Sequence, residues 1–336
     1  MEENAVLNSV KNETTSGYAA VRETAALLRP NANLVLQITG EDRKTWLQGQ
    51  ITNDVLGLGP RGSLGFCVLK PTGQILAHGR LWDAPESLYC VLPNPPREAV
   101  LDRLETMIIL EDVQIQPLDD HTLLSLQGPE ASEALSSLVE LPTLDLGFGD
   151  APNGERVILL RHDRTGEGGW DVLGSPAAIE AIASELSDFP TLSEEEWNVL
   201  RLERGEPMAG VDYDERTLVM ELGRHFVEEH ISFTKGCYTG QEVVERIRSR
   251  GHTNRTWVGL RSQAPLEAGS HVYWTDEEGD EQVVGKVTSA CVSPLFGPIA
   301  AAMLRNEAAR SGEPVRVGAV ECWVDPFPLS LEAHIG

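Results

Sequence analysis

A single cysteine stands in a setting that could support chemistry. Cys237 lies in the segment KGCYTGQE (Lys235–Glu242), whose glycines would let the backbone approach a ligand closely. A nearby lysine and a helix predicted to begin around Gly240 would both favour the thiolate, because each stabilises negative charge. The segment therefore predicts either a reactive or ligand-contacting thiol, or a tight turn that carries an incidental cysteine.

The remaining cysteines and the histidines do not extend this site into a metal centre. No two cysteines have a C-x-x-C spacing, which argues against both a disulfide framework and a tetrahedral zinc site. Four of them stand in apolar contexts and are predicted to be reduced core residues: Cys67, Cys90, Cys291 and Cys322. His225 and His230 are five residues apart, so they diverge on a helix and match no zinc-helix motif. We expect no resident metal.

The chain is strongly acidic, with a formal net charge of −25 over 336 residues. Binding to phosphate backbones needs clustered cations, so we expect no general nucleic-acid binding. One cationic strip departs from the average, and its members are Arg246, Arg248, Arg250, Arg255 and Arg261. The strip predicts either a site for an anionic ligand tail or a partner, or a solvated face that balances nearby acids.

No apolar run approaches the roughly 20 residues that a membrane helix needs, and we expect no membrane association. The N-terminal segment has neither the apolar stretch of a secretory signal nor the Arg-rich character of a transit peptide. We expect a disordered tail at residues 1–20 and a cytoplasmic protein.

The order of predicted elements indicates a duplicated α+β unit. Each of two passes comprises a strand, a helix, a hairpin of two further strands and a second helix. The first pass begins at Leu34–Thr39 and the second at Thr122–Gly128. Ser193 and Glu196 form a predicted capping box for a further helix. After about residue 255, short strands and turns predict a small β-barrel or sandwich.

The Cys237 segment resembles the signature of the YgfZ family, within the superfamily of the glycine-cleavage T-protein. LQGQITNDV (Leu47–Val55) and GKVTSACVSP (Gly285–Pro294) support the resemblance, which extends from about residue 33 to the end. It implies a T-protein-like folate-binding domain of two similar subdomains around a central cavity, at residues 21–250. A C-terminal β-barrel domain would follow at residues 253–336.

The resemblance also implies a function and partners. Proteins of this family bind folate and take part in iron–sulfur cluster assembly or repair. Bacterial members affect tRNA modification through cluster-dependent enzymes. We therefore expect tetrahydrofolate or a related reduced folate as cofactor, and iron–sulfur assembly proteins or cluster-dependent enzymes as partners. A lone Cys237 cannot hold a cluster, which normally takes four protein ligands. It would share a transient cluster with a partner, or act as a redox or exchange thiol.

Two further stretches resemble ligand-binding segments of the T-protein. TGEGGWD (Thr165–Asp171) is similar to the segment whose glutamate holds the pterin, so Glu167 is the expected pterin ligand. One carboxylate can accept both the ring N–H and the amino group of a pterin edge. Without the resemblance, Glu167 would be read as a hairpin-turn acid. Arg201 lies in LRLERG (Leu200–Gly205), and it would pair either with the ligand's carboxylate or with a structural one.

Other residues are weaker candidates for the folate site. Asn53 and Asp54 would either cap a helix end or reach the cavity, and Tyr238 and Gln241 are also expected to contact the cofactor.

One departure from the T-protein weakens a transferase function. That enzyme's hairpin reads roughly G-G-I-L-D-D and carries an assisting aspartate, whereas this chain has GQILAH (Gly73–His78). Ala77 cannot act as an acid or base. His78 could, but it is predicted to line the cavity or face outward. A binding factor is the expected function. The alternatives are a folate-dependent aminomethyltransferase or demethylase, and a scaffold that has lost folate.

Overall fold

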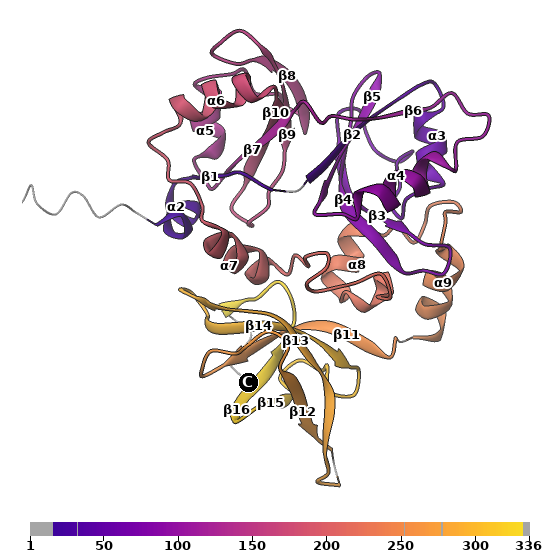
Figure 1. The fold of residues 1–336 in the computed structure, drawn as a ribbon, viewed down its shortest axis with the longest axis vertical. Helices are drawn as coiled ribbons and strands as arrows, with labels where there is room; N and C mark the ends of the chain where they lie inside the picture. The colour runs from indigo at the N-terminus through magenta and orange to yellow at the C-terminus, as the bar shows by residue number, and fades with distance from the viewer. Residues whose placement is uncertain (1–15, 32, 252, 277, 332–336) are drawn as a thin grey trace, which may run out of the picture. The chain divides into compact units, whose positions relative to one another are not determined.

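The computed structural model describes residues 16–31, 33–251, 253–276 and 278–331 (Figure 1). Most of the predicted N-terminal tail, residues 1–15, lies outside this part. The prediction of disorder as far as residue 20 is wrong, because Gly17–Glu23 form helix α2. The Ser16 side chain caps this helix, and Tyr18 and Val21 are buried. Burial of this short apolar face gives an otherwise polar segment a reason to fold.

The described residues form two compact units. The first contains the chain up to Arg29 together with Asp120–Thr143 and Gly147–Trp197. The second contains Pro30–Asp119, Leu144–Leu146 and the chain from Asn198 onward.

The first unit is built on a five-stranded sheet. In sheet order its strands are β1 (Ala26–Leu28), β7 (Thr122–Gln127), β10 (Gly169–Gly174), β9 (Arg156–Arg161) and β8 (Leu146–Asp150). Helices α5 (Ala131–Ser136) and α6 (Pro176–Glu185) both pack on β7 and β10. Leu124, Trp170 and Ile179 belong to the resulting core. The sheet and its two helices therefore form the two-layer arrangement expected of an α+β unit.

The second unit contains a sheet with the corresponding strand order, except that its edge strand β6 follows the other four strands in the chain, whereas β1 precedes them. In sheet order its strands are β6 (Gln114–Pro117), β2 (Asn33–Thr39), β5 (Ser87–Pro93), β4 (Ile75–Asp83) and β3 (Ser63–Leu69). Helices α3 (Arg43–Gln48) and α4 (Arg97–Glu105) contact β5 and β4. In each sheet the first strand of the pass pairs with the last strand before the second helix: β7 pairs with β10, and β2 pairs with β5. The shared order confirms the predicted duplication.

Both faces of this second sheet are buried. Along β3, Phe66 and Val68 enter one core, while Cys67 and Leu69 enter another. This alternation follows from the two-residue period of a strand. The second core also contains Tyr238, Trp257 and Ile299 from the C-terminal part of the chain. Val219 of the short helix η1 (Val219–Glu221) belongs to the same core. Because β3 is buried on both faces, its residues form a continuous apolar run and do not alternate between apolar and polar.

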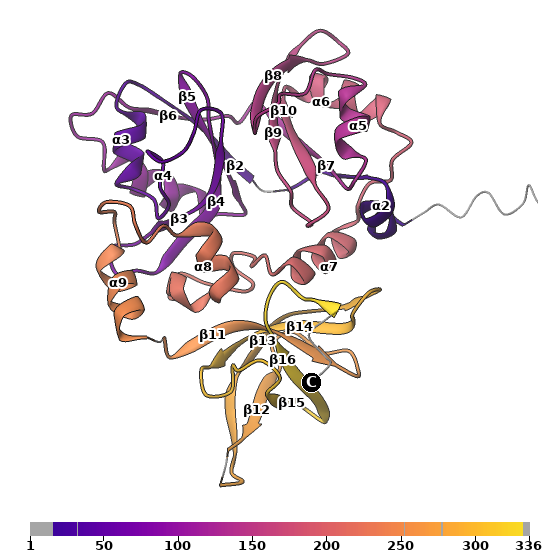
Figure 2. The same ribbon diagram turned by 180° about the vertical axis from the view of Figure 1, so that it is seen from behind.

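The C-terminal strands close into a barrel (Figure 2). In barrel order they are β11 (Arg255–Ser262), β14 (Gly297–Arg305), β13 (Glu281–Ser293), β12 (His271–Thr275), β15 (Pro314–Val317) and β16 (Val320–Asp325). The connecting helices are α7 (Glu194–Arg204), α8 (Arg224–His230) and α9 (Gln241–Arg250). Ser193 and Glu196 bond reciprocally at the start of α7, which confirms the capping box. Among the helices of the described residues, none has the length and apolar character that a bilayer crossing needs.

Candidate functional site

The segment that carries Cys237 is fixed to the end of helix α3 by a lysine. Lys235 Nζ donates to the carbonyl oxygens of Gln48, Ile51 and Asn53, at 2.6, 2.7 and 2.8 Å. The Gln48 carbonyl belongs to the last turn of α3, where carbonyls have no partner within the helix, and the Ile51 and Asn53 carbonyls lie just beyond it; one ammonium group can donate to all three. Burial lowers the pKa of Lys235 to about 8, although the Asp54 carboxylate acts to raise it.

This geometry corrects the role that the sequence predicts for Lys235. All three of its N–H groups serve the main chain and not the Cys237 thiol. Further main-chain bonds join the same two segments, including Thr239 N–H to Gly49 O at 3.1 Å. Gly240 adopts a φ of +86°, and a Cβ there would lie 2.9 Å from the Lys70 carbonyl oxygen. Cys237 is thus an exposed thiol on a loop anchored at both of its ends.

Of four neighbouring candidates, Asn53 and Asp54 make hydrogen bonds that hold this region together, whereas the buried Tyr238 hydroxyl has no partner in the described part of the chain. Asn53 Nδ2 donates to the carbonyls of Gly65 and Glu229, at 2.8 and 3.1 Å. Asp54 Oδ1 accepts from Gln48 Nε2 and from the Gly57 N–H, at 2.9 and 3.1 Å. These contacts favour the structural alternative for both residues. Tyr238 is buried, and its ring centroid lies 5.1 Å from Lys235 Nζ. Gln241 is partly buried and is the first residue of α9.

The predicted cationic strip is divided in the structure. Arg255 forms a bidentate pair with Glu221, and Arg261 pairs with Asp325. Arg246 and Arg248 are exposed on α9. The cations available to an anion on this part of the described chain are therefore fewer than the sequence indicates.

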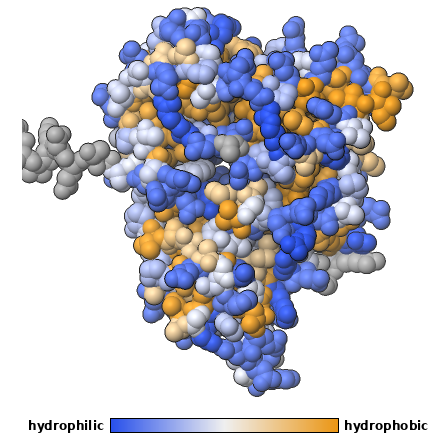
Figure 3. Space-filling model, in the orientation of Figure 1, coloured by the Kyte–Doolittle hydropathy of each residue, from blue (hydrophilic) through white to orange (hydrophobic). Residues whose placement is uncertain are grey.

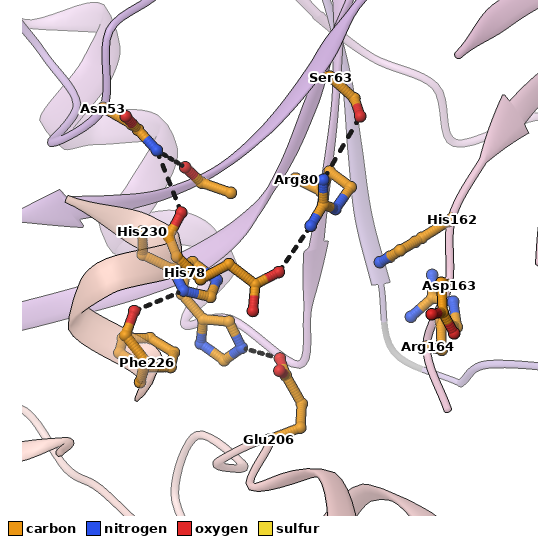
Figure 4. A network of polar contacts seen from close by, with 12 residues as sticks. Asn53, Ser63, His78, Arg80, His162, Asp163, Arg164, Glu206, Phe226 and His230 are labelled. Carbon is orange, nitrogen blue, oxygen red and sulfur yellow. Dashed lines mark hydrogen bonds and ion pairs between the residues drawn. The ribbon is translucent and has the colours of Figure 1, made fainter. Parts of the chain in front are cut away.

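His78 does not face solvent, and that part of the prediction is wrong. It is 2% exposed on β4, between the sheet and the segment that follows α7 (Figure 4). Its Nδ1 lies 2.8 Å from the Tyr213 hydroxyl and its Nε2 lies 2.8 Å from Glu206 Oε1. The Glu206 side chain is 33% exposed. This chain of contacts links a partly exposed carboxylate to a buried imidazole and a buried phenol. The Glu206–His78–Tyr213 contacts could serve in proton transfer.

Beside this array, His230 is buried and neutral over most of the accessible pH range. Its Nδ1–H donates to the Phe226 carbonyl at 2.9 Å, and its ring stacks on Phe226 with centroids 4.1 Å apart. Burial lowers the pKa of His230 to about 4, although Glu206 acts to raise it. Arg80 pairs with Glu229 at 2.6 Å in the same region (Figure 4).

Sequence reasoning missed Glu206, Tyr213, Arg80 and Glu229. Glu206 and Tyr213 come from an irregular segment, in which no periodicity indicates the direction of a side chain. Arg80 lies on β4, and alternation places it on the same face as His78, which is the one signal that could have identified it.

Arg201 acts as a structural ion-pair residue, one of the two alternatives that the sequence left open. It is 3% exposed, and its Nη1 lies 2.8 Å from Asp212 Oδ2. It also donates to the Asn198 side chain and the Glu206 carbonyl, at 2.9 and 3.1 Å. The Ser289 hydroxyl of β13 accepts a further bond at 2.9 Å. Within the second unit, Arg201 thereby ties the C-terminal part of α7 to the barrel.

Glu167 stands at the tip of the β9–β10 hairpin of the first unit. Gly166 and Gly168 flank it with φ of +92° and +87°. The Asp163 carboxylate accepts from the N–H groups of Thr165 and Gly166, at 3.2 and 2.7 Å, and this fixes the turn. The glycines permit a left-handed backbone on either side of Glu167, so the turn determines the direction of the Glu167 side chain.

The Glu167 carboxylate is oriented by an arginine from helix α2. Arg22 Nη1 donates to Glu167 Oε1, and the two side chains are 27% and 32% exposed. Within the described residues, Glu167 Oε2 accepts no hydrogen bond. The Thr165 hydroxyl is buried and likewise has no partner in the described part of the chain. A half-exposed carboxylate and an unsatisfied hydroxyl two residues away form a polar group suited to a ligand with several donors.

A buried charge cluster around Asp171 joins the two strands of this hairpin at its base. Arg164 donates to both oxygens of Asp171, at 3.0 and 2.7 Å, and His162 Nδ1 lies 2.8 Å from Asp171 Oδ2. Burial alone would raise the pKa of Asp171, but Arg164 and His162 hold it well below its usual range. Gln127 bonds to the backbone at His162 and Arg164. These contacts fix the base of the hairpin to the neighbouring strand β7.

No metal centre is formed within the ranges that the structure describes. Groups of three or more His, Cys, Asp or Glu side chains placed to hold an ion are absent there.

Comparisons with known proteins agree with this architecture. A family model described as the GCVT N-terminal domain matches residues 5–229, and one described as the glycine cleavage T-protein C-terminal barrel domain matches residues 255–324. The structure of glycine cleavage system aminomethyltransferase T from Bartonella henselae matches with a TM-score of 0.78 at 23% identity, covering 93% of this chain and 88% of that one. This match confirms the predicted T-protein-like fold.

Two curated proteins are more similar in sequence. A protein named tRNA-modifying protein YgfZ from Enterobacter sp. (strain 638) is 30% identical over 315 residues, covering 88% of this chain and 90% of that protein. The protein of the same name from Shigella sonnei (strain Ss046) is 28% identical over 313 residues, with the same coverage of both chains.

Replacing Arg201 with Met should destabilise the protein strongly. The change would leave the Asp212 carboxylate buried without its cation, which typically costs about 3–5 kcal/mol. Urea unfolding followed by circular dichroism measures the loss. Arg216→Met is the matched control, because its side chain is 84% exposed and should change stability by less than about 1 kcal/mol. Equal effects of the two substitutions would contradict the structural role.

Acid should weaken the fold through His230. The unfolded imidazole takes up a proton below pH 6.5, whereas the native one stays neutral until about pH 4. Stability is therefore lost as pH falls from 6.5 to 4, by at most about 3 kcal/mol. Unfolding free energies measured between pH 7 and pH 4 should fall less steeply for His230→Gln than for the wild type. His225→Gln, on the same helix, is the control and should keep the wild-type slope. Identical slopes for all three proteins would refute the assignment.

Proposed function

Because this chain belongs to the YgfZ family of the glycine-cleavage T-protein superfamily, we propose that it binds a reduced folate, such as tetrahydrofolate, and supports iron–sulfur cluster assembly or repair. Through cluster-dependent enzymes it would support tRNA modification, in line with the name of its curated relatives. The observation that carries the proposal is the oriented carboxylate of Glu167 at the hairpin tip. The proposed compartment is the cytoplasm.

The donor set around Glu167 fits a pterin. A carboxylate offers about four lone-pair positions, and Arg22 uses one of them on Oε1. The remaining positions can accept the ring N–H and amino group of a pterin edge as a bidentate pair. The Thr165 hydroxyl can supply one further bond to a heteroatom of the ligand. A bound reduced folate would bring a carrier for one-carbon units. The central cavity implied by the resemblance remains part of the proposal.

The proposal is a binding factor and not a transferase. Ala77, at the position where the T-protein hairpin carries an assisting aspartate, is 1% exposed and belongs to an apolar core. His78, the remaining candidate acid or base, is buried with both ring nitrogens engaged. The proposal therefore keeps Glu167 as the folate-holding residue and assigns no acid that would assist transfer.

One observation favours a second candidate function, a folate-dependent aminomethyltransferase or demethylase. The partly exposed Glu206 carboxylate bonds to His78 and so offers a route for a proton to and from the buried imidazole. That route would give His78 a catalytic use despite its burial.

Cys237 has the geometry of a thiol that acts on another macromolecule. It is exposed, and its loop is fixed to α3 by Lys235. A single cysteine supplies one ligand of the four that a cluster normally takes. A shared cluster or a thiol exchange would therefore need a partner that supplies the rest.

Calorimetric titration with tetrahydrofolate tests the Glu167 assignment. Glu167→Gln should weaken binding by about tenfold or more, because a hydrogen bond to a charged group contributes roughly 1.5–3 kcal/mol. Glu180→Gln is the matched control, since Glu180 also pairs with an arginine of the first unit, Arg29, and should leave affinity unchanged. Unchanged affinity in Glu167→Gln would remove the basis of the proposal.

A pair of substitutions separates the binding factor from the transferase. If the chain is a binding factor, Cys237→Ala abolishes its ability to restore tRNA modification in a strain lacking its relative, with tetrahydrofolate affinity nearly intact. His78→Gln then leaves that ability in place, provided that unfolding experiments show it folded. Turnover of a one-carbon donor that survives Cys237→Ala and disappears in His78→Gln would establish the transferase instead.

A further inference from the structure

The loop between α4 and β6 exposes large aliphatic side chains. Ile109 is 78% exposed and Leu110 is 94% exposed, with Met107 at 38%. We refer to these three residues as the apolar tip. Figure 3 shows hydrophobic atoms projecting at the upper right, where Figure 1 places this loop. Scattered exposed leucines are ordinary, but two adjacent aliphatic residues this exposed are a costly arrangement in water.

The apolar tip is held in place by its own backbone contacts. Glu111 Oε2 accepts from the N–H groups of Ile109 and Leu110, at 2.9 and 3.0 Å. The Met107 carbonyl accepts from Trp46 Nε1 at 3.1 Å, which fixes the start of the loop to helix α3. Main-chain and side-chain bonds between Asp112 and Asp42 fix its end. The loop thus presents its aliphatic side chains in a set geometry, which lowers the entropic cost of docking.

The charge around the apolar tip selects the kind of partner. Residues 104–118 contain Glu105, Glu111 and Asp112 and no lysine or arginine. An anionic lipid surface or a nucleic acid would be repelled by this segment. A protein with a small apolar pocket bordered by lysines or arginines would be complementary both in polarity and in charge.

The apolar tip and Cys237 are anchored to the same short helix. Trp46 of α3 holds the loop at Met107, and Gln48 of α3 accepts from Lys235, two residues before the thiol. The six residues of α3 span only about 9 Å. A partner that buries about 800 Å² of this chain, the usual size of a specific interface, can cover both features.

From this arrangement we propose that the apolar tip is the docking anchor for the partner protein that meets Cys237. Ile109 and Leu110 fill an apolar pocket on that partner, and the surrounding acids pair with a basic rim. The inference rests on the proposed role of Cys237 as a thiol shared with a partner. It adds where that partner binds and what chemistry its surface has.

The test uses the full chain in cells that lack its relative. The double variant Ile109→Asp, Leu110→Asp should reduce restored tRNA modification at least tenfold, while thermal stability and tetrahydrofolate affinity stay at wild-type values. Val292→Asp, Leu295→Asp is the matched control, because both side chains are exposed on the barrel and the variant should behave as wild type. Full activity of the tip variant would overturn the proposal.

Crosslinking identifies the occupant. A benzophenone amino acid at position 110 and a benzophenone maleimide on Cys237 should each yield one adduct with the same protein. The adduct from position 110 should decrease at high salt and in the variant Glu105→Lys. Adducts with a second copy of this chain, with lipid only, or with different proteins from the two positions would each overturn the proposal. Failure of the folate titration would leave this result unaffected, whereas full activity of Cys237→Ala would remove the shared thiol on which the inference rests.

Discussion

The Cys237 loop depends on one buried ammonium group. Lys235 satisfies three carbonyl oxygens at and beyond the end of α3, and these carbonyls come from a segment more than 180 residues earlier in the chain. A neutral or shorter side chain could not reach and satisfy all three. The two segments on which the resemblance rests, Leu47–Val55 and Lys235–Glu242, therefore meet in a single contact. Their co-occurrence has a physical cause, because each would leave polar groups unsatisfied without the other.

The same logic applies to Glu167. Its hairpin is fixed from below by the Asp171 cluster and oriented from the side by Arg22. At the proposed folate site, a carboxylate held in this way would discriminate among ligands, because a molecule that lacks the matching donors leaves a charge poorly solvated. The proposed tasks of the two sites differ accordingly: recognition of a small molecule at the fixed hairpin tip, and contact with a macromolecule at the exposed Cys237 thiol.

The fold was largely predictable from the sequence, and the detailed site was less so. Strand alternation, the Ser193 capping box and the repeated element order all follow from local periodicity, which tertiary contacts did not override here. The function of Lys235 was not predictable, because its acceptors are main-chain carbonyls that no side-chain pattern reveals. The burial of His78 was missed for a related reason. Its cover comes from Tyr213, in an irregular segment, and from Phe226 of α8, and no local pattern shows that either packs against β4.

The sheet of the second unit shares its two faces between two cores, and this has a consequence for the newly synthesised chain. Cys67 and Leu69 on β3 are covered by residues as distant as Trp257 and Ile299. At roughly 5–20 residues per second, the ribosome needs on the order of ten seconds or more to make that cover after β3 has emerged. During this interval one apolar face of the sheet has no native partner. Completion of the second unit therefore waits until the strands that contain Trp257 and Ile299 have been made.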